Sequence, residues 1–325
     1  MSWQNFIPAV ESKKLLKQRD SHLTLVNHCT REYEGEVENL GDRVKIYGVG
    51  SPTIYTLEKD GTYTANEVGA GSIAGTGKKI IHGGIPSAEE IEDIEVEIQI
   101  NHMAVWNYGV GDIDAALMGG KKSKMSQLRK RQAVKLAEEQ ERFVAKLMQG
   151  FMPCRFKGAE GNRTSGGKAT NVFHIGKTFS DTAGSETTTP CNLLDFVVQL
   201  LNENDVSDSE KIVCECSPKF YRWLKAEYRD LDTNNSKLVS GRKFGEYNDI
   251  DVCKTNYTRI KDDLGVVHEY VFVRTLNSVA FLDPLTKQEG YRPNNGFIDC
   301  VKGFNLHDGA IVDPKGLAVI EVDYA

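Results

Sequence analysis

Apolar and polar residues follow a helical period at the start of the chain. Apolar side chains recur at Leu15, Leu16, Leu23, Leu25 and Val26. This spacing predicts a short amphipathic helix within an N-terminal arm. One short helix buries little apolar surface by itself, so we expect the arm to dock on its own domain or on another copy of the chain.

Residues 33–100 predict two strands that are joined by a long excursion. Apolar and polar residues alternate like a strand in 44–47 and again in 94–100. Between them, 61–86 is rich in glycine, threonine and alanine, so it cannot bury enough apolar surface to hold itself rigid. We therefore predict that 47–92 is an extended, mobile excursion between two strands.

The longest helical pattern covers residues 121–149. It contains no proline or glycine, and its apolar residues recur at spacings of three and four. Gly150 and Pro153 follow and would end the helix. At 1.5 Å per residue it would be roughly 40 Å long. Its first half carries a basic cluster formed by Lys121, Lys122, Lys124, Arg129, Lys130, Arg131 and Lys135.

A polar loop and a compact mixed domain follow the long helix. The loop covers 156–189 and is rich in glycine. Helices are predicted at 192–203 and 218–228, the second with Ser217 as its N-cap. The strands predicted in this region and in the C-terminal tail are 212–214, 250–252, 269–273, 300–304, 310–312 and 317–322. This mixture of elements predicts an α+β fold.

The composition is that of a folded protein. Of 325 residues, 40% are hydrophobic and 26% are charged, which suits one large or two medium domains. The net charge of −6 gives no overall attraction to nucleic acid, so contact with a polyanion would need a local basic patch. We expect no secretory signal at the start and no membrane contact, since no stretch approaches the roughly 18–20 apolar residues that span a bilayer.

The residues that usually carry enzyme chemistry lack the required spacing. The seven cysteines are scattered and odd in number, which predicts buried, reduced thiols. The histidines show no metal-ligand spacing, and Gly-x-Ser-x-Gly is absent. A phosphate loop is also excluded, because five residues separate Gly71 from Gly77 and Lys79 replaces the metal-binding hydroxyl. We therefore expect no enzymatic activity, no catalytic residue, no metal and no cofactor.

An acidic run leads into the second strand of the excursion. It begins with Glu89, Glu90 and Glu92 and continues to Glu97. Because these carboxylates alternate along the strand, most should face one side. They form either a solvated face or a charged seam that meets basic residues of a neighbouring copy. The basic residues for such a seam are Lys121, Lys122 and Lys124 at the start of the long helix, or Lys13, Lys14, Lys17 and Arg19 in the arm.

The order of these segments resembles the major capsid protein of tailed bacteriophages, with the Hong Kong 97-type fold. The similarity to the prophage-type branch of that family lies in three places. The matching residues are Phe6-Ile7-Pro8, Asn27, 33–37, Gly41-Asp42 and 44–46 in the first part, Asp112-Ile113-Asp114 before the long helix, and 301–303, 309–314 and 317–320 near the end. Pro218, Phe220, Leu224 and 250–252 match the central domain of the family.

The resemblance implies a role for each segment. The implied segments are an N-terminal arm (1–32), an extended loop with its flanking strands (33–100), a peripheral domain with a spine helix at 121–149 (101–189), an axial domain (190–290) and C-terminal strands that return to the peripheral domain (291–325). It also implies self-assembly into pentamers and hexamers that form an icosahedral head around double-stranded DNA, in the virion and, during assembly, in the host cytoplasm.

The resemblance implies partners as well. Relatives with a built-in scaffold carry a long helical segment ahead of the arm, so here we expect a separate scaffolding protein or a processed chain. A portal protein, a decoration protein and non-specific proximity to packaged DNA are also expected. Some relatives crosslink a loop lysine to an asparagine of a neighbour, and Lys78 and Lys79 lie in the corresponding loop. Two alternatives stay open, namely an encapsulin-like compartment with cellular cargo and an unrelated enzyme.

Overall fold

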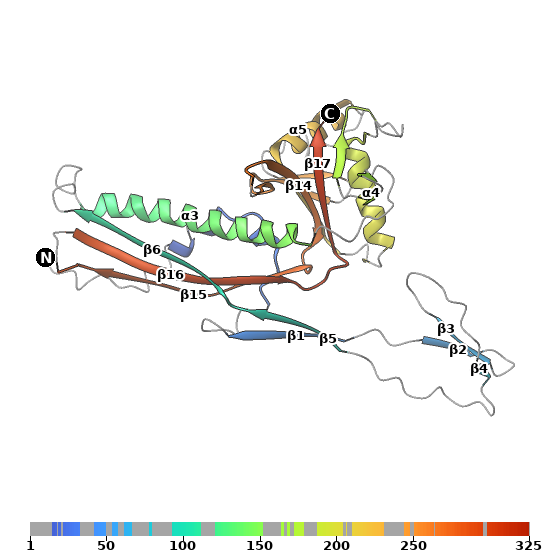
Figure 1. Cartoon of the computed structure of the whole chain (residues 1–325), viewed down its shortest axis with the longest axis horizontal. Coiled ribbons are helices and arrows are strands. Elements are labelled where there is room, and N and C mark those ends of the chain that lie inside the picture. Colours follow the sequence, from blue (N-terminus) through green and yellow to red (C-terminus); the bar gives the residue numbers. More distant parts are fainter. Residues whose placement is uncertain are drawn as a thin grey trace.

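The computed structural model describes most of the chain (Figure 1). The described residues are 15–17, 19–20, 22–32, 42–49, 54–57, 62–66, 78–79, 93–111, 121–151, 164–165, 168–169, 172–178, 187–203, 206, 210–230, 244–247, 250–262, 264–294 and 298–324. They form a long layer with one helix, a compact part with two helices, and an extension of paired strands that leads away from both (Figure 1).

The long layer consists of one helix on a three-stranded antiparallel sheet in the order β15-β16-β6. Its elements are β6 (His102–Gly111), α3 (Lys121–Gln149), β15 (Val279–Tyr291) and β16 (Ile298–Ile311). Alternate residues of β6 face the helix, where Trp106 packs with Ala133 and Leu136. The predicted helix over 121–149 is confirmed. A helix so rich in charge is stable here because its apolar face lies on the sheet.

The compact part contains a seven-stranded sheet in the order β11-β12-β10-β14-β17-β9, with β13 paired to β14. Its elements are β9 (Val172–Ile175), α4 (Pro190–Glu203), β10 (Ile212–Cys216), α5 (Pro218–Asp230), β11 (Phe244–Tyr247), β12 (Ile250–Lys254), β13 (Arg259–Lys261), β14 (Val267–Thr275) and β17 (Leu317–Tyr324). Val271 and Val273 pack with α4 and α5, whereas Tyr270 and Phe272 face α3 and the arm. The alternating side chains of β14 thus join two hydrophobic cores.

The N-cap predicted for α5 is present. The Ser217 side-chain oxygen accepts a hydrogen bond from the backbone N–H of Phe220 at 3.2 Å. Pro218 follows as the first helical residue, where its missing N–H has no cost. These local signals therefore fix the beginning of α5 as predicted.

Several strands differ from the prediction. Part of the predicted polar loop 156–189 is β9, which pairs in parallel with β17, and β7 (Thr164–Ser165) and β8 (Lys168–Ala169) pair with each other. The strands predicted at 300–304 and 310–312 are one strand, β16, because the polar residues between them are buried and hydrogen-bonded within the layer.

Two strands lie in a different sheet from the one that the implied segments suggest. Strand β17 belongs to the C-terminal segment 291–325, yet it pairs with β14 in the seven-stranded sheet. Strand β15 begins at Val279, inside the predicted segment 190–290, yet it belongs to the long sheet. Both differences have the same cause, since strand pairing between distant segments leaves no local sequence signal.

The extension begins with two antiparallel strands, β1 (Arg43–Val49) and β5 (Asp93–Gln99). Their register pairs Val49 with Asp93, so the predicted return of the chain to its partner strand is confirmed. Val44, Ile46 and Ile98 pack on the face of the long sheet opposite α3. Beyond this pair, β2 (Ile54–Leu57), β3 (Thr62–Asn66) and β4 (Lys78–Lys79) form a small sheet that stands away from both larger sheets (Figure 1).

Candidate functional site

Of the residues predicted for assembly, those that the structure describes lie in three separate parts of the chain. Lys17 is exposed at the end of a short helical turn. The backbone of Lys78 and Lys79 forms β4, which pairs with β3. The backbone of Lys121, Lys122 and Lys124 forms the first turn of α3. The residues that lie outside the described part of the chain are Lys13, Lys14, Glu89, Glu90 and Glu92. The charged seam therefore stays a prediction.

Two charged residues of the predicted seam have partners within their own chain. Glu97 forms an ion pair with Arg43 at 2.8 Å across the β1–β5 pair, and both side chains are exposed. Arg19, one of the basic residues considered for a seam with a neighbouring copy, is buried in its own chain. Its guanidinium donates hydrogen bonds to Asp20 and Asp283. Arg19 therefore fixes the arm to the long sheet of its own chain.

The described part of the arm docks on its own body. We call residues 23–30 the arm turn; it includes the 3-10 turn η2 (Val26–His28). Leu23, Leu25 and Val26 are almost completely buried between α3 and the seven-stranded sheet. Thr30 then bridges to β15, with its N–H donating to the Val279 carbonyl at 2.9 Å. The arm turn thus touches both larger sheets and the long helix.

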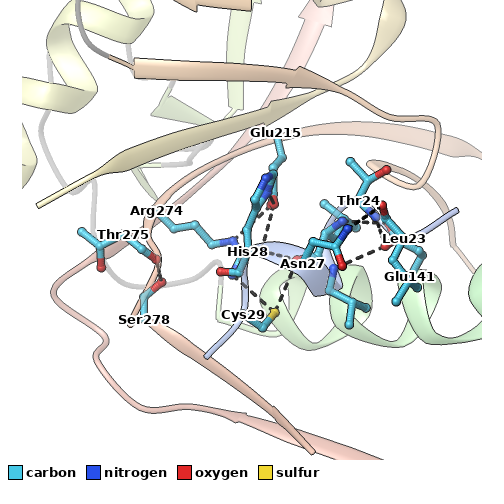
Figure 2. Close-up of polar contacts among 12 residues, drawn as sticks. Leu23, Thr24, Asn27, His28, Cys29, Glu141, Glu215, Arg274, Thr275 and Ser278 are labelled. Atoms are coloured by element: carbon cyan, nitrogen blue, oxygen red, sulfur yellow. Dashed lines mark hydrogen bonds and ion pairs between the residues drawn. The ribbon is translucent and has the colours of Figure 1, made fainter. Parts of the chain in front are cut away.

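Glu141 of α3 binds the beginning of the arm turn. Its buried carboxylate accepts hydrogen bonds from the backbone N–H groups of Thr24, Leu25 and Val26, the last two at 3.0 and 3.3 Å (Figure 2). Burial raises the pKa of Glu141, and these three bonds oppose that shift. A carboxylate at the N-terminal end of a helical turn stabilises N–H groups that have no partner in the turn itself.

Arg274 of β14 binds the end of the arm turn. Its fully buried guanidinium donates to the carbonyl oxygens of Leu25 at 2.8 Å and His28 at 3.0 Å, and to the Cys29 sulfur at 3.5 Å. The two remaining N–H groups form a bidentate pair with Glu215 of β10, at 3.1 and 2.8 Å (Figure 2). All five donors of the guanidinium therefore have a partner.

The charges in this cluster hold each other in the ionised state. Burial raises the pKa of Glu215, but the Arg274 charge and hydrogen bonds from His28 and Arg274 outweigh it, so the pKa lies below its usual range. His28 Nδ1 lies 2.7 Å from Glu215 Oε1. Burial also lowers the pKa of Arg274, and the Glu215 charge more than reverses this. The pair is thus compensated within a site closed to water.

A second buried cluster fixes the arm to the long sheet. Arg19 contacts Asp283 of β15, which also accepts from the Asn305 amide of β16. Gln140 of α3 donates to Asn305 Oδ1 at 3.1 Å, and His307 Nδ1 lies 3.1 Å from the same oxygen. The two clusters together connect the arm, α3 and strands of both larger sheets.

The sequence patterns did not indicate these clusters, although one signal was present. Glu215 lies between two cysteines in an apolar strand, and Arg274 ends the apolar run of β14. A charged residue on the buried face of an apolar strand needs an opposite charge within the fold. The two residues could therefore have been predicted as a buried pair. Their contacts with the arm could not, because these depend on tertiary packing.

A candidate metal centre is not found among the described residues. These residues contain no group of three or more His, Cys, Asp or Glu side chains that could hold a metal ion. A cavity of about 480 Å³ lies beside Pro190 and Trp223, with Lys177 and Arg222 among its lining residues. Among the helices in the described part of the chain, none has the length and apolar content needed to span a bilayer.

Comparisons with known proteins find similarity in structure only. No protein-family model matches the chain, and no curated protein is similar to it. A structure of Mycobacterium phage Che8 is 19% identical with a TM-score of 0.61, and the match covers 93% of this chain and 91% of that chain. The capsid of cyanophage P-SCSP1u is 15% identical with a TM-score of 0.57, over 89% and 85% of the two chains. The mature capsid of bacteriophage PhiM1 is 10% identical with a TM-score of 0.58, over 89% and 84%.

The chain therefore has the fold of phage capsid structures, and the predicted Hong Kong 97-type α+β fold is confirmed. The match includes nearly the whole length of both chains. The likeness to the prophage-type branch stays a prediction.

Proposed function

We propose that this chain is a major capsid protein that assembles with copies of itself into the icosahedral head of a tailed phage or prophage. The observation that carries the proposal is the shared fold over 93% of the chain with a structure of Mycobacterium phage Che8, together with a paired-strand extension that leads away from the body (Figure 1). The small sheet of β2, β3 and β4 in this extension stands away from both larger sheets, so another copy of the chain can cover it.

The surface of the long layer supports contacts between copies. Met103, Val105 and Ile298 are 48%, 66% and 42% exposed. All three lie on the sheet face opposite α3, which is also the face on which the β1–β5 pair packs. Apolar side chains that gather on one face are typical of an interaction surface. Many modest contacts of this kind suffice to hold a closed shell, because they act together.

The architecture supports a division of roles. The seven-stranded sheet with α4 and α5 would form the axial domain, whose copies meet in pentamers and hexamers. The long layer with α3 would form the peripheral domain, and the β1–β5 pair would carry the extended loop to a neighbour. We propose a structural role without catalysis, in the virion and, during assembly, in the host cytoplasm.

The partners follow from this role. A head that is filled with DNA requires a portal, and we expect a separate scaffolding protein to set the size of the shell. A decoration protein on the outer surface and a crosslink through Lys78 or Lys79 also belong to the proposal. The charged seam between the acidic run and Lys121, Lys122 and Lys124 would set the register between copies.

Purification of the full chain, alone and with the scaffold encoded beside it, tests the proposal. Light scattering should show particles far larger than one chain, and electron microscopy should show closed shells. A chain that stays monomeric under every condition would contradict the proposal. The genes next to this one separate phage heads from cellular compartments, because portal and packaging genes support the first and a cargo enzyme the second.

A further inference from the structure

The hairpin between β13 and β14 presents three apolar side chains to solvent. Leu264, Val266 and Val267 are 89%, 54% and 39% exposed, and we call them the apolar tip. Single exposed apolar residues are common on protein surfaces, but three exposed neighbours concentrate apolar surface at the end of one hairpin. Such a patch gains free energy when another surface covers it.

The shape of the apolar tip is set before any partner binds. Asp262 Oδ1 accepts hydrogen bonds from the N–H groups of Leu264 at 3.0 Å and Val266 at 2.8 Å. Gly265 has a φ of +83°, which side chains rarely tolerate, so glycine suits the turn. A hairpin that is already ordered loses little conformational entropy on binding.

The apolar tip also carries a negative charge. Some burial raises the pKa of Asp262, but hydrogen bonds from Val266, His268 and Leu264 outweigh it and lower the pKa. Asp262 is exposed and its Oδ2 lies 3.4 Å from His268 Nε2. The hairpin therefore offers an apolar end beside a carboxylate that is ionised at neutral pH.

The cavity of about 480 Å³ has the complementary character. It lies between the end of β9 and the helices α4 and α5, with Pro190, Trp223 and Ala226 as apolar lining and Lys177 and Arg222 as exposed basic lining. The Trp223 ring packs against Tyr324 at 5.8 Å between centroids, which fixes this wall. Glu227 also lines the cavity, and its carboxylate accepts a hydrogen bond from the Cys191 N–H at 3.0 Å.

The strand that leads to the tip and the wall of the cavity pack on different faces of the seven-stranded sheet. Ile260, in the strand before the tip, packs in the core that includes α3. Trp223 packs against the core of α4 and α5 on the other face. Leu264 is too exposed to occupy the cavity of its own chain. Two unlike patches on one chain allow a head-to-tail contact, which closes into a ring when the rotation between copies permits.

We propose that the apolar tip of one copy inserts into this cavity of the adjacent copy, with Asp262 facing Lys177 and Arg222. This inference rests on the proposed function, because it names a contact within the rings from which the shell would form. One hairpin buries too little surface to hold two chains by itself. It therefore adds to the other contacts and sets the rotation between neighbouring copies in the ring.

A cysteine crosslink tests the contact directly. In the variant with both Leu264→Cys and Ala226→Cys, oxidation of assembled protein should give a ladder of covalent oligomers on a non-reducing gel. Each single variant should give no ladder, which controls for the native thiols. A mixture of the two single variants should stop at dimers, because each chain then has only one half of the contact.

The outcomes separate this contact from the proposed function. Shells that form without the ladder of covalent oligomers would contradict the proposed contact but would still support the proposed function. Crosslinking of Leu264→Cys alone would show a symmetric tip-to-tip contact and would also overturn the proposed contact. Chains that never assemble would overturn both.

A second variant measures the contribution of the tip. Leu264→Ser should raise the protein concentration at which half of the chains assemble about tenfold, since a central contact residue is lost. Its melting temperature should stay unchanged, because the side chain is exposed. Leu276→Ser, at a 36% exposed leucine in the turn between β14 and β15, is the matched control. Equal assembly of the two variants would contradict the proposal.

Discussion

At the scale of single residues, the stability of the fold depends on Arg274. It is fully buried, and it joins Glu215 to the carbonyl oxygens of the arm turn. An ion pair that is closed to water adds little when intact, but loss of one partner leaves the other charge buried without compensation. The free energy of unfolding should therefore depend strongly on this one side chain.

Arg274→Met tests that dependence. It should lower the free energy of unfolding by about 3–5 kcal/mol, measured by urea denaturation. Addition of Glu215→Gln should restore part of the loss, because the unpaired charge is then removed. Arg259→Met is the control, since its ion pair with Glu269 is half exposed and should contribute less than about 1 kcal/mol. Equal losses for Arg274→Met and Arg259→Met would contradict the account.

His307 makes the stability depend on pH. Burial, with the charges of His102 and Arg19, lowers its pKa to about 4, and Asp308 opposes the shift. The unfolded chain binds a proton near pH 6.5, whereas the folded chain does not until about pH 4. The stabilisation is therefore complete above about pH 6.5 and is lost as pH falls toward 4, by at most about 3 kcal/mol.

His307→Gln should reduce the loss of unfolding free energy that occurs as pH falls. The variant has to be compared with the unmodified chain at each pH, because other groups also bind protons in this range. Burial raises the pKa values of Glu141 and Asp283, so these two groups stabilise the fold as pH falls. Urea denaturation at pH 7.5 and 4.5 measures the effect, with His22→Gln at an exposed position as control. An unchanged pH dependence in His307→Gln would show that another group is responsible.

At the scale of elements, the arm turn is held by a carboxylate at its start and a guanidinium at its end. Glu141→Gln should weaken the first contact, because the amide offers one acceptor where the carboxylate offers two and its NH₂ faces other donors. Hydrogen exchange at residues 24–26 should become about tenfold faster. Glu139→Gln, exposed on the same helix, should leave exchange unchanged. Unaltered exchange in Glu141→Gln would mean that apolar packing alone holds the arm.

The sequence predicted elements with strong local signals and missed those that depend on distant pairing. The 29 residues of α3 have helical periodicity and a clear end at Gly150, so its bounds could be predicted. Strand β9 has four residues and pairs with a segment near the C-terminus, so nothing local distinguished it from a loop. In the site, only the charged residues inside apolar strands gave a signal, and their partners in the arm gave none.

At the scale of the whole molecule, the charged seam is proposed to set the register between copies. Reversal of Lys121, Lys122 and Lys124 to Glu should impair assembly, because these residues would then repel the acidic run of the neighbour. The defect should diminish as salt rises, since screening weakens the repulsion. Light scattering at several salt concentrations measures both effects.

The matched control has the same net charge. It reverses Lys146, Lys287 and Lys315, which are exposed and lie outside the predicted seam. If both triple variants assemble equally well, the acidic run is a solvated face.

The most direct test of the account is an electron cryo-microscopy map of the assembled full chain, traced from β1 through β2, β3 and β4 to β5. We expect the small sheet of β2, β3 and β4 to lie on an adjacent copy in every ring. A map in which this sheet folds back onto its own subunit, or a sample that contains only monomers, would contradict the account.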